Sequence, residues 1–214
     1  MLLVEVEVLR LEDKWINNQV TLVGTLGGKP VYSHHSRDVA YYTFPLEISR
    51  LSGAHDQINV LAKEDLLESL SISPMPKVMI EGQLRSFNNK SGIGQRLVIS
   101  VYANAVSLVD TEDLNQLILK GVLCKPPNLR RTPMGREICD LLLAVARPYG
   151  RSDYLPCITW GQNAAEASTW QVGQKVHLEG RVQSRKYVKQ EGVHSVEKTA
   201  FEVSVVKQEV CKTE

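Results

Sequence analysis

The chain has 214 residues, of which 43% are hydrophobic and 23% are charged, and its formal net charge is +1. This composition is that of a soluble globular protein long enough for one large or two small domains. It excludes a protein that attracts a polyanion through its overall charge.

The charge is distributed unevenly along the chain. Residues 1–112 carry 10 Lys and Arg against 13 Asp and Glu, whereas residues 113–214 carry 15 against 11. The second half is therefore net basic, which favours an anionic ligand there.

Cysteine usage and the N-terminal sequence indicate a cytoplasmic protein. The cysteines are far apart and form no C-x-x-C pair, so we expect buried free thiols in a reducing compartment and neither a metal nor a cofactor. They are Cys124, Cys139, Cys157 and Cys211. The apolar N-terminus is broken by Glu5, Glu7 and Arg10 and does not resemble a signal peptide. No apolar run is long enough to span a membrane.

The first half contains strand patterns and one helical pattern. Apolar and charged residues alternate over 2–11, which predicts a strand or an extended arm. From residue 19, strand-like sequence is interrupted by Gly24, Gly27 and Gly28, as expected at the bends of a small barrel. Further strands are predicted at 39–50, 57–62, 77–87 and 95–109, with a short helix at 63–72 that Pro74 and Pro76 end.

The same pattern starts again after the acidic break at 110–113. NQLILKG at 115–121 matches NQVTLVG at 18–24, and KVHLEG at 175–180 matches KVMIEG at 77–82. We interpret these matches as an internal duplication with domains 1–112 and 113–214. Five strands with a short helix between the third and fourth are the element order of the OB fold. We therefore predict an all-β protein of two tandem OB folds, which are five-stranded Greek-key barrels.

The stretch Leu141–Gln162 combines aromatic rings with arginines. Two strand patterns flank a turn that holds Pro148 and Gly150 among basic and aromatic residues. Such strands can stack unpaired bases while cations contact phosphates. The alternative is an ordinary hairpin whose aromatic residues are half-buried.

At this point the chain resembles the bacterial single-stranded DNA-binding protein family, including its primosomal replication-restart branch. The first repeat carries VTLVGTLGGKP and IEGQLR, and the second carries LILKGVLCKPP, TPMGREICDLLLAVAR, ITWGQNAAEAS and KVHLEGRVQSRKYVKQ. Replicative members usually end in a disordered linker and a short acidic tip. This sequence ends in VVKQEVCKTE, so the resemblance favours a primosomal or accessory role.

The resemblance implies four base-stacking positions in each barrel. In the second repeat these positions hold Tyr149, Tyr154, Trp160 and Tyr187, whereas the first repeat holds Leu51, His55, Leu61 and Asn89. The second barrel is therefore expected to bind, and the first to have a degenerate face. The basic residues near the four rings would contact phosphates. These are Arg147, Arg151, Arg185, Lys186 and Lys189, together with Arg130 and Arg131 in an expected loop.

Two of these aromatic assignments have a structural alternative. Trp160 lies among apolar residues and could equally belong to the core, whereas Trp170 is expected to be structural. His34 and His35 are expected in a surface turn, because no ligand set surrounds them. Neither a phosphate-binding loop nor a nucleophile elbow occurs, so the sequence does not indicate an enzyme.

Two functions remain open at this stage. The leading hypothesis is a module that binds single-stranded DNA with little sequence preference, with RNA as an alternative ligand. The rival is an assembly platform for replication or restart proteins. The short connection near residues 110–113 should make the two barrels pair within one chain, and a homodimer would then present four barrels.

Overall fold

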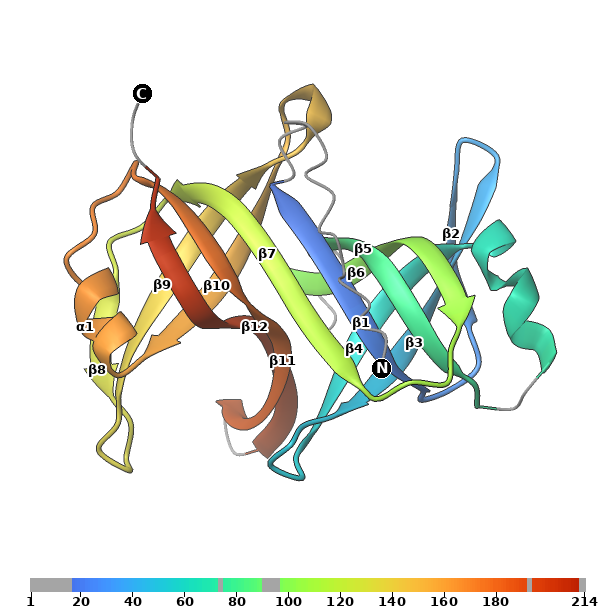
Figure 1. Ribbon diagram of the computed structural model, residues 1–214, viewed down its shortest axis with the longest axis horizontal. Coiled ribbons are helices and arrows are strands. Elements are labelled where there is room, and N and C mark those ends of the chain that lie inside the picture. Colours follow the sequence, from blue (N-terminus) through green and yellow to red (C-terminus); the bar gives the residue numbers. More distant parts are fainter. Residues whose placement is uncertain (1–16, 73–74, 90–96, 192–193, 212–214) are drawn as a thin grey trace, which may run out of the picture.

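The computed structural model describes residues 17–72, 75–89, 97–191 and 194–211, which form two β-barrels lying side by side (Figure 1). The arm predicted at 2–11 lies outside these residues. Strands dominate the described part, as the sequence predicts. No helix in it is long and apolar enough to cross a membrane.

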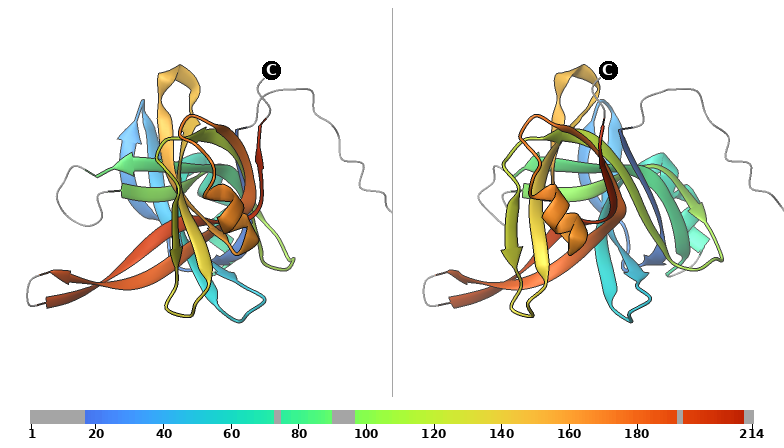
Figure 2. Two further views of the ribbon diagram at one scale, coloured as in Figure 1. Left: turned by 90° about the vertical axis from the view of Figure 1, so that its left-hand side faces the viewer. Right: turned by 60° about the vertical axis from the view of Figure 1, so that its left-hand side comes forward.

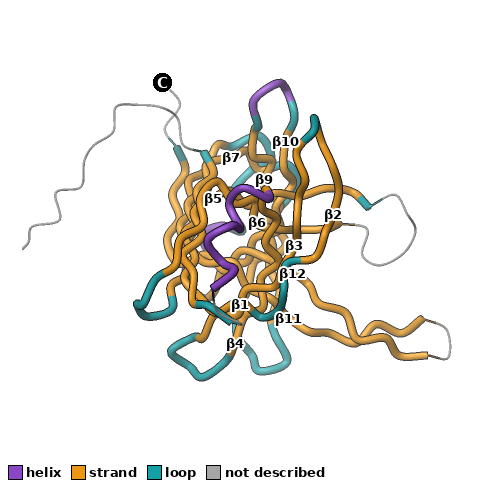
Figure 3. The backbone as a smooth tube through the Cα atoms, turned by 90° about the vertical axis from the view of Figure 1, so that its right-hand side faces the viewer, coloured by secondary structure: helices purple, strands orange, loops and turns teal. Residues whose placement is uncertain are grey.

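The first barrel closes because its first strand bends and pairs on two sides. Strand β1 pairs with β5 from Val20 to Thr25, and its end pairs with β3 at Thr25 and Leu26. Its described elements are β1 (Asn18–Leu26), β2 (Val31–Ser36), β3 (Val39–Ser49), β4 (His55–Lys63), the 3₁₀ helix η1 (Glu64–Ile72), β5 (Lys77–Asn88) and β6 (Leu97–Leu108). Viewed from the first-barrel end, η1 lies in front of the strands (Figure 3).

The second barrel repeats this topology. Strand β7 pairs with β11 and, at Val122 and Leu123, with β9. The described elements are β7 (Leu114–Leu123), β8 (Asn128–Arg131), β9 (Glu137–Ala146), the 3₁₀ turn η2 (Pro148–Gly150), β10 (Ser152–Trp160), α1 (Gln162–Ala167), β11 (Lys175–Glu191) and β12 (His194–Val210). The long β11–β12 hairpin projects from the body of the molecule (Figure 2).

The expected OB folds are confirmed, with differences in detail. Each barrel has a short additional strand, β2 or β8, which pairs with the strand that follows it. In the first repeat β2 is separated from β1 at 27–30, where Pro30 has no amide hydrogen to continue a ladder. The predicted turn at His34 and His35 is therefore wrong, because both lie in β2, although both are exposed as expected.

Alternation along the strands fills the barrel interiors. Phe44, Leu46 and Ile48 are buried on β3, and Leu141, Leu143 and Val145 on β9. Trp170 is 6% exposed, which confirms its structural role. All four cysteines are free, but only Cys139 and Cys157 are buried. Burial raises the pKa of both buried thiols, so they stay protonated.

A glycine after a β-bulge explains the EG sequence shared by the repeats. The ladder register shifts immediately before Gly82 in β5 and before Gly180 in β11. A Cβ at Gly82 would lie 2.2 Å from the Tyr102 carbonyl oxygen, and one at Gly180 2.2 Å from that of Ser204. Only glycine allows the neighbouring strand to approach this closely.

Replacing Gly180 by alanine is therefore expected to destabilise the protein. The methyl group meets backbone rather than a movable side chain, and such overpacking costs about 1–3 kcal/mol. Chemical denaturation would measure the change. Gly28→Ala is the matched control, because its added Cβ would meet nothing closer than 3.8 Å. Equal stability of the two variants would contradict this explanation.

The two barrels pair within the chain, as predicted, and their first strands form the contact. Strands β1 and β7 pair antiparallel from Asn18 opposite Leu119 to Val23 opposite Leu114. Val20 lies opposite Leu117, which is its equivalent in the repeat. The barrels are thus related by an approximate two-fold axis, and the described strands form one 12-stranded sheet. A homodimer of the whole chain stays a prediction.

A buried aspartate of the first barrel accepts a hydrogen bond from the second barrel. Asp56 on β4 is 1% exposed and accepts a hydrogen bond from Nε of Arg50 at 2.6 Å. Its Oδ1 also accepts the backbone N–H of Ser184 on β11, at 2.9 Å. The Ser184 hydroxyl in turn accepts the N–H of Gln57, at 3.0 Å.

The same arrangement occurs in the opposite direction. Asp153 on β10 is fully buried, and it accepts Nε of Arg147 and the backbone N–H of Ser86 on β5, both at 2.5 Å. The Ser86 hydroxyl accepts the N–H of Tyr154, at 2.8 Å. Arg85 adds a weaker contact to Asp153, at 3.4 Å. Two equivalent polar contacts therefore fix the relative orientation of the barrels.

Candidate nucleic-acid interface

A groove of about 850 Å³ lies on the outer face of the second barrel and reaches the first barrel. Its walls come from β9 to β12 and the β8–β9 hairpin, and the residue that follows β3 completes it. The charged and aromatic lining residues are Arg50, Arg130, Arg136, Trp160, Arg181, Arg185 and Glu202. Arg50 and Arg130 are paired with Asp56 and Asp140, which do not line the groove, and the other three arginines face one lining carboxylate, Glu202, so the groove attracts anions.

Strand β10 presents aromatic rings outward beside this groove. Alternation places Tyr154, Ile158 and Trp160 on the outer face, while Leu155 and Cys157 fill the core. Tyr154 is 50% exposed and Trp160 is 38% exposed. Trp160 is therefore not a core residue. Both rings retain enough exposed area to stack on a base.

Strand β11 supplies cations on the same side. Every second residue of this strand points to the same face, and that face carries Arg181, Gln183, Arg185 and Tyr187. The first three of these residues line the groove. The Arg185 guanidinium lies over the Tyr187 ring at 5.6 Å from its centroid. The distance from its Nε to the Glu202 carboxylate is 3.9 Å. The Arg185 side chain is 56% exposed and its guanidinium is only loosely paired, so it is available to a phosphate.

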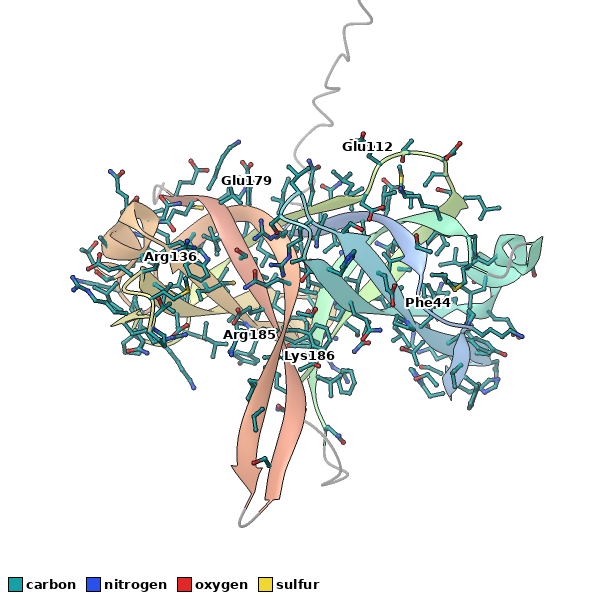
Figure 4. All side chains as sticks on the ribbon, turned by 90° about the horizontal axis from the view of Figure 1, so that it is seen from below. Phe44, Glu112, Arg136, Glu179, Arg185 and Lys186 are labelled. Atoms are coloured by element: carbon teal, nitrogen blue, oxygen red, sulfur yellow. The ribbon has the colours of Figure 1, made fainter. Side chains whose placement is uncertain are left out.

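Lys186 points to the other side of the hairpin, because adjacent residues of a strand face opposite ways. Figure 4 shows Arg185 and Lys186 at the base of the hairpin on different sides of the ribbon. Glu112 and Glu179 lie toward the opposite edge of the same view, away from the hairpin. The basic side of the molecule is thus separated from these acidic residues.

Only some of the arginines in the β8–β9 hairpin line the groove. Arg130 lies in β8 and pairs with Asp140 at 2.5 Å, and this hydrogen bond is the main reason that the pKa of Arg130 is raised. Arg131 lies on the opposite face of β8, pairs with Glu137 at 3.0 Å and does not line the groove. The loop predicted for both residues is wrong, because they form a strand. Arg136, in the turn, lines the groove and is exposed.

The remaining predicted residues do not belong to the described lining of the groove. Arg147 is bound to buried Asp153, so it serves the contact between the barrels. Arg151 is exposed directly before β10. Tyr149 lies in η2 and Lys189 in β11, but their side chains are outside the described part of the structure.

Among the lining residues that sequence reasoning missed are Arg50, Arg136, Arg181 and Gln183. The two-residue spacing of Arg181, Gln183 and Arg185 was a usable signal, because it places them on one strand face. Arg50 had no such signal, since only the docking of the barrels brings it to the groove. Nε of Arg181 is buried and has no hydrogen-bond partner among the described residues, which favours an anionic or water ligand there.

Comparison with known proteins identifies relatives by sequence. The model of the single-strand binding protein family matches residues 114–210. Single-stranded DNA-binding protein B of Bacillus subtilis is 36% identical over 87 residues, which are 37% of this chain and 77% of that protein. Single-stranded DNA-binding protein A of the same organism is 34% identical over 86 residues, 37% of this chain and 50% of that protein.

A solved structure extends the similarity to both barrels. Wild-type single-stranded DNA binding protein from Thermus aquaticus superposes with a TM-score of 0.75 at 22% identity, covering 92% of this chain and 94% of that one. At this identity the likeness shows the fold.

The single-stranded DNA-binding protein of Halalkalibacterium halodurans is a further relative by sequence. It is 33% identical over 86 residues, which are 37% of this chain. The chain spans about half the length of that protein and of the B. subtilis A protein.

Proposed function

The chain belongs to the single-strand binding protein family, and we propose that it binds single-stranded DNA, chiefly in the groove of the second barrel, without catalysing a reaction. The observation that carries this proposal is the exposed Trp160 beside five arginines in one groove. Replication, repair or replication restart would supply such a ligand.

The groove supplies both kinds of contact that an unpaired strand needs. Bases stack on Trp160 in the groove and on Tyr154 beside it, while Arg136 and Arg185 contact the phosphates. Every base has a π-face, so this mode gives little sequence preference. Stacking does not distinguish the sugars, and oligo-rU is therefore the comparison ligand for oligo-dT.

Binding to oligo-dT is expected to weaken steeply with salt. Each phosphate contact adds about 0.7 to the slope of log K against log salt concentration for a single strand. Arg136→Ala and Arg185→Ala should each weaken binding and flatten the slope by about this amount. Fluorescence anisotropy of a labelled oligo-dT, measured at several salt concentrations, gives both quantities.

The matched control is Arg131→Ala, which removes the same charge from the face of β8 away from the groove. It should leave the slope nearly unchanged. The groove would be the wrong site if all three variants changed the slope equally. Absence of oligo-dT binding by the unmodified protein at low salt would contradict the proposed function itself.

A further inference from the structure

The first barrel carries aromatic residues on the face that corresponds to the groove, although at other positions than the second barrel. Tyr41 lies opposite Lys63, as Ile138 lies opposite Trp160. Leu61 lies beside Tyr102 in the parallel ladder, as Ile158 lies beside Ser204. Tyr41 and Tyr102 therefore occupy the places that Ile138 and Ser204 occupy in the groove.

These rings form a row across several strands. His34 on β2 stacks on Tyr41 of β3, with ring centroids 4.9 Å apart and planes 5° apart. Tyr41 meets Tyr102 of β6, with centroids 6.1 Å apart and hydroxyls 3.4 Å apart. The Arg85 guanidinium of β5 lies over the Tyr102 ring, 5.9 Å from its centroid. The row therefore crosses the face from β2 to β5, in the sheet order β2-β3-β4-β6-β5.

The row lies outside the barrel core. Every residue of β2 is exposed, and the inward residues of β3, such as Phe44, are on the other face. Phe87 follows Arg85 by two residues on the same face of β5 and is 51% exposed. The row has an exposed ring, His34, at its β2 end, and Phe87 is a further exposed ring along β5, which suits the flat faces of unpaired bases.

The charges around the row are mixed but include two cations at its edges. Lys63 lies across the ladder from Tyr41, and Arg85 covers Tyr102. The charge of Asp65 contributes a little to the raised pKa of Tyr102, which is due mainly to burial. The Glu64 carboxylate accepts a hydrogen bond from the hydroxyl of Tyr42, and Tyr42 lies on the face of β3 opposite to Tyr41. Arg85 also contacts the buried Asp153 carboxylate, so Lys63 is the cation that a phosphate backbone passing over the row would meet.

We propose that His34, Tyr41, Phe87 and Tyr102 form a second base-stacking surface, which holds the part of a single DNA strand that extends beyond the groove. This inference rests on the proposed function, because a strand must first bind in the groove. The approximate two-fold axis gives the two barrels equivalent faces, so one strand can contact both. The first barrel would then add to the site size, even though the four aligned positions Leu51, His55, Leu61 and Asn89 are not Phe, Tyr or Trp.

The test compares two oligonucleotide lengths in the full chain. An oligo-dT of about 10 nucleotides fits one OB fold, and one of about 35 nucleotides exceeds it. Tyr41→Leu with Tyr102→Leu keeps an apolar side chain at each position and removes the rings. We expect at least about tenfold weaker binding of the long oligonucleotide, with less than about twofold change for the short one. His34→Ala with Phe87→Ala, in exposed positions, should act in the same direction without disturbing the fold.

Tyr32→Ala is the matched control. Tyr32 is 52% exposed in the same hairpin but contacts Tyr42 and His35, away from the row. It should leave binding of both lengths unchanged. If the unmodified protein binds both lengths but neither double variant weakens the long one, the inference is overturned and the proposed function stands. If the unmodified protein binds neither length, both are overturned.

Discussion

Replacing Asp153 by alanine is expected to lower the free energy of unfolding by about 3–5 kcal/mol, the cost of breaking a buried ion pair by removing one partner. The carboxylate is fully buried and binds Arg147, Arg85 and the backbone N–H of Ser86. Its loss leaves the Arg147 guanidinium, on a side chain that is only 25% exposed, without its carboxylate partner and the Ser86 N–H without its acceptor. Chemical denaturation followed by circular dichroism would measure the change.

Asp140→Ala is the control for this prediction. Asp140 also pairs with an arginine, Arg130, but its side chain is 38% exposed and that of Arg130 is 45% exposed. Surface pairs of this kind contribute at most about 1 kcal/mol. Asp56→Ala should behave like Asp153→Ala, because Asp56 makes the equivalent contacts in the opposite direction. A loss for Asp153→Ala no larger than that for Asp140→Ala would show that the contact between the barrels does not depend on these carboxylates.

The fold could be predicted from the sequence because its signals are local and occur twice. Alternation located most strands, and the duplication supplied the element order a second time. The glycine of the EG block was visible as a shared feature, but its cause was not. That cause is the carbonyl oxygen of a neighbouring strand, which only the bulge brings close to Gly82 and Gly180.

The candidate site was less accessible to sequence reasoning because it depends on which side a residue faces and on docking. The sequence predicts that Arg147 contacts a phosphate, yet the β9–β10 hairpin brings it to buried Asp153. Arg50 reaches the groove from the other barrel. Alternation alone separates Lys186 from Arg185, so that distinction could have been made.

The aromatic row of the first barrel was missed for a different reason. The repeat offset is about 97 residues for most strands, which aligns Tyr41 with Ile138. The ladders instead match Tyr102 with Ser204, an offset of 102, because the strands of the β11–β12 hairpin, with 17 residues each, are longer than β5 and β6, with 12 each. A constant offset could therefore not bring Tyr41 and Tyr102 to the same face.

Replacing Trp160 and Tyr154 together by alanine is expected to weaken binding of oligo-dT by at least about 30-fold. Each stacked base contributes about 1–3 kcal/mol when its aromatic partner is truncated, so two rings account for at least about 2 kcal/mol. Neither change removes a charge, and the salt slope should stay the same. This combination distinguishes stacking from the phosphate contacts of Arg136 and Arg185. Anisotropy of a labelled oligo-dT would measure both affinity and slope.

Trp160→Phe is the matched control, because it keeps a ring at the end of β10 and should retain most of the affinity.

The same variant also identifies the tryptophan whose fluorescence reports binding. Trp170 is 6% exposed, so among the described tryptophans Trp160 should account for the quenching of intrinsic fluorescence by oligo-dT. Trp160→Phe should abolish that quenching while binding persists. A melting temperature lowered by the alanine changes, with affinity unaltered, would mean that these rings only support the barrel, and the stacking role would then be rejected.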